Sequence, residues 1–184
     1  MGRLEFRKAV ETDIDSILNI IRQAQAYFKE QGIDQWQNGY PNYETIKSDI
    51  DNQYGYVLLK DRDIVATVAL IFDGEKSYET IYEGSWISSE EEYATIHRIA
   101  VHSDYKGLGL GSIIINKIED ICSSRGINSI RVDTHEDNLS MQRLLYKNGF
   151  KYCGIIYLED NSKRLAFEKL LTRENTINFV ENTV

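Results

Sequence analysis

The sequence contains little proline and little cysteine. Pro41 is the one proline among 184 residues, and no low-complexity segment is present, so long disordered segments are not expected. The two cysteines, Cys122 and Cys153, form no Cys-x-x-Cys pair, and the three histidines are not spaced with them as zinc ligands are. We therefore expect neither a disulfide framework nor a metal site.

Basic residues are outnumbered by acidic ones. The chain has 21 Lys and Arg against 29 Asp and Glu, which gives a net charge of −8. Nucleic acids and anionic membrane surfaces require clustered Lys and Arg, so neither is expected as a partner. The acidity favours a cationic substrate such as an amine, or it serves solubility alone. No signal peptide and no apolar run of membrane-spanning length is found, which predicts a cytoplasmic protein.

The hydrophobic pattern changes repeatedly between the period of a strand and that of a helix. Apolar residues make up 42% of the chain, enough for one core, so we predict a single domain over residues 1–172 and a polar tail over residues 173–184. The predicted strands cover residues 4–9, 56–60, 64–71, 96–101, 127–133, 150–158 and 164–170, and the predicted helices cover about 12–31, 43–52, 113–125 and 138–148. Residues 73–92 have no clear period. The interleaving predicts a mixed α/β fold, with a sheet covered by helices on both faces.

A glycine-rich loop connects a predicted strand to a predicted helix. Its sequence is Lys106-Gly107-Leu108-Gly109-Leu110-Gly111-Ser112. The first N–H groups of a helix lack internal partners and lie at the positive end of its dipole, where proteins bind phosphate. The alternating glycines let a ligand approach the backbone, and Lys106 adds a positive charge. We interpret the loop as a pyrophosphate site; a flexible helix entrance without a ligand is the alternative.

The spacing distinguishes this loop from two other nucleotide-binding motifs. Gly-x-Gly-x-Gly differs from the dinucleotide fingerprint, and Gly111-Ser112 lacks the lysine of a P-loop. The loop resembles the Arg/Gln-x-x-Gly-x-Gly/Ala acetyl-CoA loop of the GCN5-related N-acetyltransferases (GNAT family), with Lys106 in the Arg/Gln position. A second segment, from Asn138 to Phe150, resembles the Asn-…-Leu-Tyr-x-x-x-Gly-Phe signature of the same family. The resemblance implies the GNAT fold, whose central mixed β-sheet is splayed, and acetyl-CoA as the cofactor.

The resemblance also implies roles for individual residues. Ile99 and Val101 would pair through their backbone with the pantetheine arm, and the N–H groups of residues 106–112 would hold the pyrophosphate. Asn138 would form a hydrogen bond with the pantetheine arm or the acetyl end. Tyr146 would protonate the departing thiolate, since its ordinary pKa of about 10 is close to that of a thiol; simple core packing is the alternative for Tyr146.

The general base is less clearly marked. His97 resembles the histidine of the arylalkylamine N-acetyltransferase branch, which acts as a base through water, and an imidazole titrates near neutral pH. Alternatively His97 is a hydrogen-bonded strand residue, or Glu91 or Glu92 acts through a water chain. Strict strand alternation places on one face Thr95, His97, Ile99 and Val101, and places Arg98 on the other.

Aromatic and polar residues in loops are the candidates for the acceptor site. Trp36 and Tyr40 lie in one loop and Trp86 in another, and in a GNAT fold both loops border the acceptor. They would form aromatic walls for an amine, with cation–π contacts, or they pack the loops together. Asp133 and His135 end a predicted strand near the splay, and either shape the acceptor site or anchor a loop.

Together these residues predict an acetyl-CoA-dependent N-acetyltransferase. A base would take the amine proton, and a primary amine of a small molecule, peptide or protein would attack the thioester carbonyl directly. A non-catalytic acyl-CoA-binding sensor on the same fold is the alternative. A toxin that acetylates aminoacyl-tRNA is disfavoured by the negative net charge. The sequence identifies neither the acceptor nor the oligomeric state, for which the resemblance leaves a homodimer open.

Overall fold

The computed structural model describes residues 3–89 and 91–171, so the predicted tail lies outside the described residues. The strands are β1 (Leu4–Lys8), β2 (Gly55–Lys60), β3 (Asp63–Ile71), β4 (Ala94–Val101), β5 (Ser129–Thr134), β6 (Lys151–Tyr157) and β7 (Lys163–Leu170). The α-helices are α1 (Ile14–Glu30), α2 (Tyr43–Asp51), α3 (Leu110–Ser124) and α4 (Leu139–Lys147). The order agrees with the prediction from periodicity, although α3 begins inside the glycine-rich loop rather than after it.

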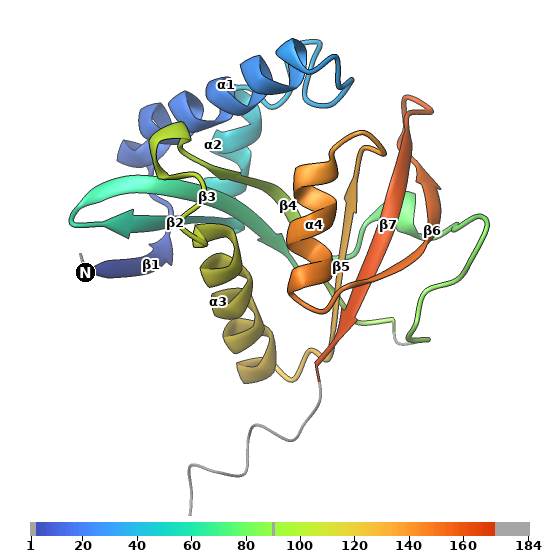
Figure 1. Cartoon of the computed structure of the whole chain (residues 1–184). Coiled ribbons are helices and arrows are strands. Elements are labelled where there is room, and N and C mark those ends of the chain that lie inside the picture. Colours follow the sequence, from blue (N-terminus) through green and yellow to red (C-terminus); the bar gives the residue numbers. More distant parts are fainter. Residues whose placement is uncertain (1–2, 90, 172–184) are drawn as a thin grey trace, which may run out of the picture.

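The strands form one mixed sheet in the order β1-β2-β3-β4-β5-β7-β6 (Figure 1). Neighbouring strands run antiparallel except for β4 and β5, which are parallel. The pairs β2–β3 and β6–β7 are hairpins with short connections, whereas α3 makes the crossover from β4 to β5 that a parallel pair requires. The predicted mixed α/β class is confirmed.

The sheet opens between its two central strands. β4 and β5 pair only at their beginning, where Ala94 lies opposite Ile130 and Thr95 lies opposite Arg131. After these positions β4 remains paired with β3 and β5 remains paired with β7. The predicted splay is therefore present, and it leaves one edge of β4 without a strand partner.

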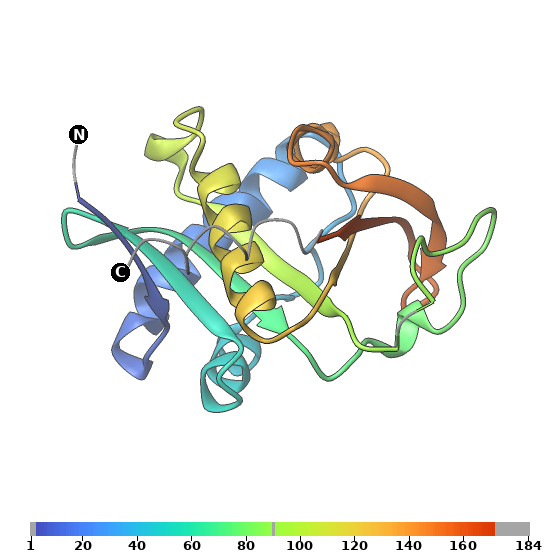
Figure 2. The same cartoon turned by 90° about the horizontal axis from the view of Figure 1, so that it is seen from below.

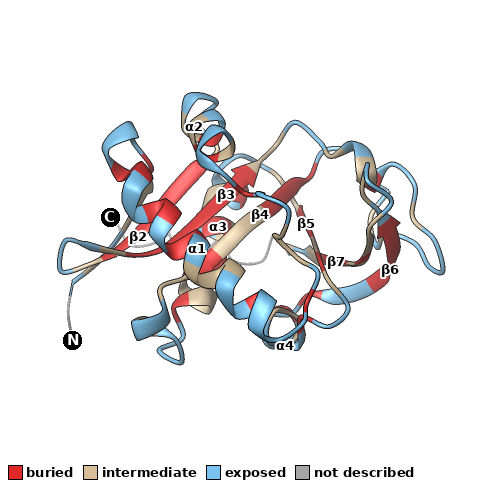
Figure 3. Cartoon of the chain, turned by 90° about the horizontal axis from the view of Figure 1, so that it is seen from above, coloured by how far each residue is buried: buried red, intermediate tan, exposed pale blue. Residues whose placement is uncertain are grey.

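Helices cover both faces of the sheet (Figure 1). On one face, α1 and α2 pack their isoleucines against β2 in a cluster that contains Ile17, Ile21 and Ile46. On the other face, α3 and α4 contribute Ile114 and Leu145 to a larger cluster. The buried strands therefore lie between two layers of amphipathic helices whose outer surfaces are exposed (Figure 3). Among the described residues, no helix is both long enough and apolar enough to cross a bilayer.

A β-bulge interrupts the alternation of β4. Ala69 of β3 pairs with His97 and Thr67 pairs with Ala100, so a single residue of β3 lies opposite Arg98 and Ile99. Arg98 has a φ of 52°, the left-handed conformation that accommodates the extra residue. Ile99 consequently packs in the same cluster as Ile96, whereas Ala100 packs with α1.

The prediction from strict alternation is therefore wrong. His97 does not share a face with Ile99, because Ile96 and Ile99 lie on the α3 side of the sheet and His97 follows Ile96 directly. Arg98 does not lie on the opposite face from His97 either. Its guanidinium donates to Asp49 of α2, which covers the face of the sheet opposite to α3. The bulge thus directs the side chains of His97 and Arg98 away from the cluster of apolar residues that packs against α3.

The segment predicted to be irregular covers the β5–β7 part of the sheet. It contains a short 3-10 helix at Lys76–Tyr78, and Tyr82 forms a β-bridge with Ile155 of β6. Tyr78 is buried there against Ile156 and Ala166. Figure 2 shows this segment beside β6 and β7, at the end of the molecule far from β1.

Candidate functional site

The glycine-rich loop presents unpaired backbone N–H groups at the beginning of α3. Gly107 and Gly109 have φ angles of 80° and 76°, which glycine adopts without strain, and Gly109 caps the helix. Within the described chain, no backbone or side-chain acceptor is bonded to any N–H group from residues 107–112. A Cβ added at Gly107 or Gly109 would meet nothing within 4 Å. These N–H groups are therefore open to a ligand, whereas the N–H of Lys106, which was predicted to join them, donates to the Ser103 carbonyl at 3.3 Å.

Two residues of the loop act in packing. A Cβ at Gly111 would lie 2.9 Å from Cδ2 of Leu144, so this glycine allows α3 and α4 to approach closely. The ammonium group of Lys106 lies 4.4 Å from the centre of the Tyr27 ring on α1. That cation–π contact holds a positive charge beside the helix entrance.

A cavity of about 510 Å³ lies where β4 and β5 diverge. Ile99 lines it from β4 and Val132 lines it from β5. Its walls also include residues from the loop after α1, from the segment before β4 and from the turn between β6 and β7. Three elements that are distant in the sequence therefore enclose the opening in the sheet.

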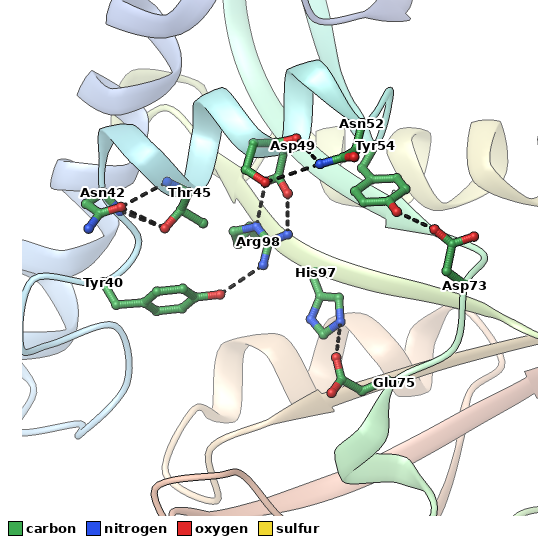
Figure 4. A network of polar contacts seen from close by, with 11 residues as sticks. Tyr40, Asn42, Thr45, Asp49, Asn52, Tyr54, Asp73, Glu75, His97 and Arg98 are labelled. Carbon is green, nitrogen blue, oxygen red and sulfur yellow. Dashed lines mark hydrogen bonds and ion pairs between the residues drawn. The ribbon is translucent and has the colours of Figure 1, made fainter.

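His97 and Glu75 form a hydrogen-bonded pair on the cavity wall (Figure 4). The distance from Nε2 of His97 to Oε2 of Glu75 is 3.1 Å, and the two side chains are 19% and 28% exposed. Ser77 donates from its hydroxyl to Oε1 of Glu75 at 2.8 Å. The bond with His97, supported by those from Ser77, lowers the pKa of Glu75 to about 2. A carboxylate is thereby held ionised against the imidazole.

Asp133 lines the opposite wall and is held by the same 3-10 helix. The Tyr78 hydroxyl donates to Oδ2 of Asp133 at 2.7 Å. Burial raises the pKa of the Asp133 carboxyl, although the electrostatic interaction with His97, the bond from Tyr78 and the attraction of Arg164 oppose this. Glu75 and Tyr78 are three residues apart. The same short turn therefore contacts His97 of β4 through Glu75 and Asp133 of β5 through Tyr78.

Arg98, Asp49 and Tyr40 form a second network at the cavity (Figure 4). Nε and Nη2 of Arg98 donate to the two oxygens of Asp49 at 2.7 and 2.6 Å. Nη1 of Arg98 donates to the Tyr40 hydroxyl at 2.9 Å. Trp36 lines the cavity beside Tyr40, and its ring packs edge-on against Phe28 of α1. The loop after α1 is thus fastened to both the bulge and the helix.

Gln35 and Asn138 connect this loop to α4. The Asn138 side chain accepts from the Met141 N–H as the N-cap of α4, and its amide donates to Oε1 of Gln35 at 3.0 Å. Asn138 is buried and lines the cavity. His135 lies outside the cavity lining, and its Nδ1 accepts from the backbone N–H of Asp137 at 3.1 Å. This arrangement agrees with the loop-anchoring alternative for His135.

Tyr146 and Trp86 do not line the cavity. Tyr146 lies on α4 with 56% of its surface exposed, and its ring packs edge-on against Phe167. Trp86 packs on Tyr78 at a centroid distance of 5.2 Å and donates from its ring to the Tyr78 carbonyl. Trp86 therefore supports the residue that binds Asp133 rather than forming a wall of the cavity.

The structure thus gathers part of the predicted set. The predicted residues in the cavity lining are Trp36, Tyr40, His97, Ile99, Asp133 and Asn138. The structure adds cavity residues that sequence reasoning missed, namely Gln35, Glu75 and Arg164. The sequence carries no signal for them, because each reaches the site from an element whose position is set by tertiary packing.

The sequence comparisons agree with this architecture. Residues 18–150 match the profile of the Acetyltransferase (GNAT) family. The chain belongs to the GNAT acetyltransferase family. It is an N-acetyltransferase, and the acceptor is not identified by the comparisons.

Relatives of this GNAT protein come from several bacteria. A GNAT acetyltransferase from Streptococcus agalactiae is 34% identical, with a TM-score of 0.85 over 94% of this chain and 99% of that one. The uncharacterized N-acetyltransferase YesJ of Bacillus subtilis is 24% identical over 90% of this chain and 89% of its own length. The putative acetyltransferase yncA of Salmonella typhimurium, whose structure was solved with acetyl-CoA, shares the fold at 14% identity, with a TM-score of 0.65 over 92% of this chain and 95% of that one.

The residues of this GNAT chain fit the acyl-CoA that the family uses. The unpaired N–H groups at the beginning of α3 match the needs of a pyrophosphate, and Gly107 and Gly109 leave the approach open. The unpaired edge of β4 after Thr95 offers backbone groups to an extended arm. Among the described residues, no group of three or more His, Cys, Asp or Glu is arranged to hold a metal ion.

Proposed function

We propose that this enzyme transfers the acetyl group of acetyl-CoA to a primary amine of a small molecule or peptide. The observation that carries the proposal is the cavity between β4 and β5, with His97 on its wall and the open N–H groups of α3 at the other end of β4. When bound, acetyl-CoA supplies the activated thioester. The amine nitrogen forms a bond to the carbonyl carbon, and the carbon–sulfur bond breaks.

His97 is the general base of the proposed reaction. Its Nε2 donates to Glu75, so the neutral imidazole carries its lone pair on Nδ1. That nitrogen takes the proton of the amine, directly or through one water molecule. The ionised Glu75 then stabilises the imidazolium that forms, because the two groups are 3.1 Å apart.

The remaining roles belong to groups nearer the cofactor. The N–H groups of residues 107–112 hold the pyrophosphate, with Lys106 beside them, and the backbone of Ile99 and Val101 pairs with the pantetheine arm. Asn138 binds the arm near the acetyl end, where its buried side chain faces the cavity. Tyr146 gives its proton to the departing thiolate.

Direct attack is favoured over an acetylated cysteine. Burial raises the pKa of the Cys122 thiol to about 12 and that of Cys153 to about 11. Neither thiol forms the thiolate that a covalent mechanism needs near neutral pH. The amine therefore reacts in a complex that contains both substrates.

The test is acetylation of a panel of primary amines by the full chain, with CoA release followed as a function of pH. His97→Gln is expected to lower kcat by about 100-fold and to flatten the acidic limb of the pH profile, because the titrating base is absent. The KM for acetyl-CoA should not change. An unaltered pH profile in His97→Gln would contradict the assignment of the base.

A further inference from the structure

Arg164 is a buried arginine on the cavity wall that forms no ion pair with any residue that the structure describes. It lies on β7, is 8% exposed and lines the cavity. Its single hydrogen bond runs from Nη1 to the carbonyl oxygen of Lys163, the preceding residue, at 2.8 Å. Within residues 3–89 and 91–171, no carboxylate oxygen lies within 4 Å of its guanidinium. A buried guanidinium in this state has unused donors.

The other arginines that are partly or fully buried in the described part of the chain are paired. Arg98 lies 2.6 Å from Asp49, and Arg131 lies 3.2 Å from Glu168 on the same face of the sheet as Arg164. Burial of a charge without a bonded partner is costly, and Arg164, unlike Arg98 and Arg131, has only the longer-range attraction of Asp133 and Asp160. The missing partner is therefore to be sought in the cavity.

The unused nitrogens of Arg164 are open to the cavity. In the described part of the chain, the one fully enclosed side-chain nitrogen or oxygen without a hydrogen bond is Oγ1 of Thr95. The donors of Arg164 that lack a protein acceptor are therefore not sealed in the core. Because Arg164 lines the cavity, they face the space that the acceptor occupies.

Two carboxylates attract Arg164 without forming an ion pair with it. Asp160 in the β6–β7 turn accepts from the Ser162 N–H at 2.9 Å, and the bonds from Ser162, with a smaller contribution from Arg164, lower the pKa of its carboxyl. Asp133 on β5 accepts from Tyr78. Both also lie close enough to repel a strongly charged anion, so a singly charged carboxylate suits the site better than a phosphate dianion.

We propose that the acceptor is an amino acid whose carboxylate binds Arg164 while its amine points toward His97. This assignment rests on the proposed function, because it divides the same cavity between the two ends of one substrate. A planar carboxylate can accept two parallel hydrogen bonds from the guanidinium. The ionised Glu75, which is bonded to His97, attracts the ammonium form before His97 deprotonates it.

The first test uses the full-length wild-type enzyme and pairs of acceptors. Each pair is an amino acid and its amide, with one to four carbons between the amine and the carboxyl group, and phosphoethanolamine is added as the phosphate probe. We expect kcat/KM to be about 10- to 100-fold higher for the acid than for the amide in the best pair, as for a charge-assisted hydrogen-bonded pair. Equal values for acid and amide in every pair, or a preference for phosphoethanolamine, would overturn the assignment.

The second test compares two substitutions on adjacent residues of β7. Arg164→Gln is expected to remove the preference for the acid and to leave the KM for acetyl-CoA unchanged. Lys163→Gln also removes one positive charge, on the residue that precedes Arg164. Because Lys163 binds Glu136 outside the cavity, the preference for the acid over the amide should persist in this variant. If Arg164→Gln lowered kcat/KM equally for acids and amides, the role of Arg164 would be structural.

Failure of the proposed function is distinguishable from failure of this assignment. If neutral amines are acetylated as well as amino acids, the function stands and the role of Arg164 is wrong. If no acceptor releases CoA, the proposed function fails. The acids and amides are then compared by calorimetric titration into the protein with acetyl-CoA, where equal affinities would overturn the role of Arg164 as well.

Discussion

Two glycines at opposite ends of α3 allow the cofactor loop to be tested with a matched control. Gly109 precedes the helix and Gly126 follows it, with φ angles of 76° and 74°. A Cβ at either position would meet nothing within 4 Å, so alanine causes no clash. The two substitutions therefore impose the same backbone strain in the same open surroundings, and differ only in which end of the helix they alter.

The strain sets the expected change in stability. A non-glycine residue in the left-handed conformation costs about 1 to 2 kcal/mol. For a chain of this size each kcal/mol lowers Tm by about 3 °C, so Gly109→Ala and Gly126→Ala should both melt a few degrees below the wild type. Gly111 is not suitable for this comparison, because its Cβ would lie 2.9 Å from Leu144.

The binding of acetyl-CoA should separate the two variants. Displacement of one or two N–H groups from the pyrophosphate costs about 1.4 kcal/mol, a tenfold loss of affinity, and only Gly109→Ala alters those groups. Calorimetric titration with acetyl-CoA, with NAD as the control ligand, measures the difference. Equal affinities of Gly109→Ala and Gly126→Ala would refute the placement of the pyrophosphate at the beginning of α3.

Three further substitutions test the rest of the site. Tyr146→Phe should lower kcat by about 100-fold without a change in Tm, since its ring keeps the contact with Phe167; an unchanged kcat would exclude it as the acid. Asp49→Asn should reduce the free energy of unfolding in urea by about 3 kcal/mol, because it leaves the buried guanidinium of Arg98 without a countercharge. The pKa of Glu75 is lowered to about 2 from 4.5, so its contribution is complete above pH 5 and is lost as the pH falls toward 2. Urea unfolding between pH 6 and pH 2.5 should show a loss of stability that is about 2 kcal/mol larger in the wild type than in Glu75→Gln, and identical pH dependence would contradict the hydrogen-bonded pair.

The sequence was informative where function depends on local backbone geometry. Gly107 and Gly109 adopt the positive φ angles that only glycine takes easily, and the helix begins immediately after them. The apolar periods located the helices and strands because each packs one face against a common core. The splay was predicted through the family resemblance rather than from the periods themselves.

The sequence was uninformative where the site depends on distant segments. The bulge is centred on Arg98, an arginine in a conformation that sequence rules assign to Gly or Asn, so alternation gave the wrong face for Ile99. Glu75 reaches the cavity from the N-cap of a 3-10 helix, and Arg164 reaches it from β7, the neighbour of β5. Their roles depend on which residues become paired and which do not after folding, and this is a property of the tertiary structure.

The most direct test of the account is a steady-state kinetic analysis in which acetyl-CoA and a primary amine are varied together. Direct attack in the cavity predicts intersecting double-reciprocal lines, an N-acetylated amine in the mass spectrum and no acetylated protein. Parallel lines with an acetyl group on Cys122, Cys153 or another side chain would contradict direct transfer. Tight binding of acetyl-CoA without transfer to any amine would contradict the proposed acetylation itself.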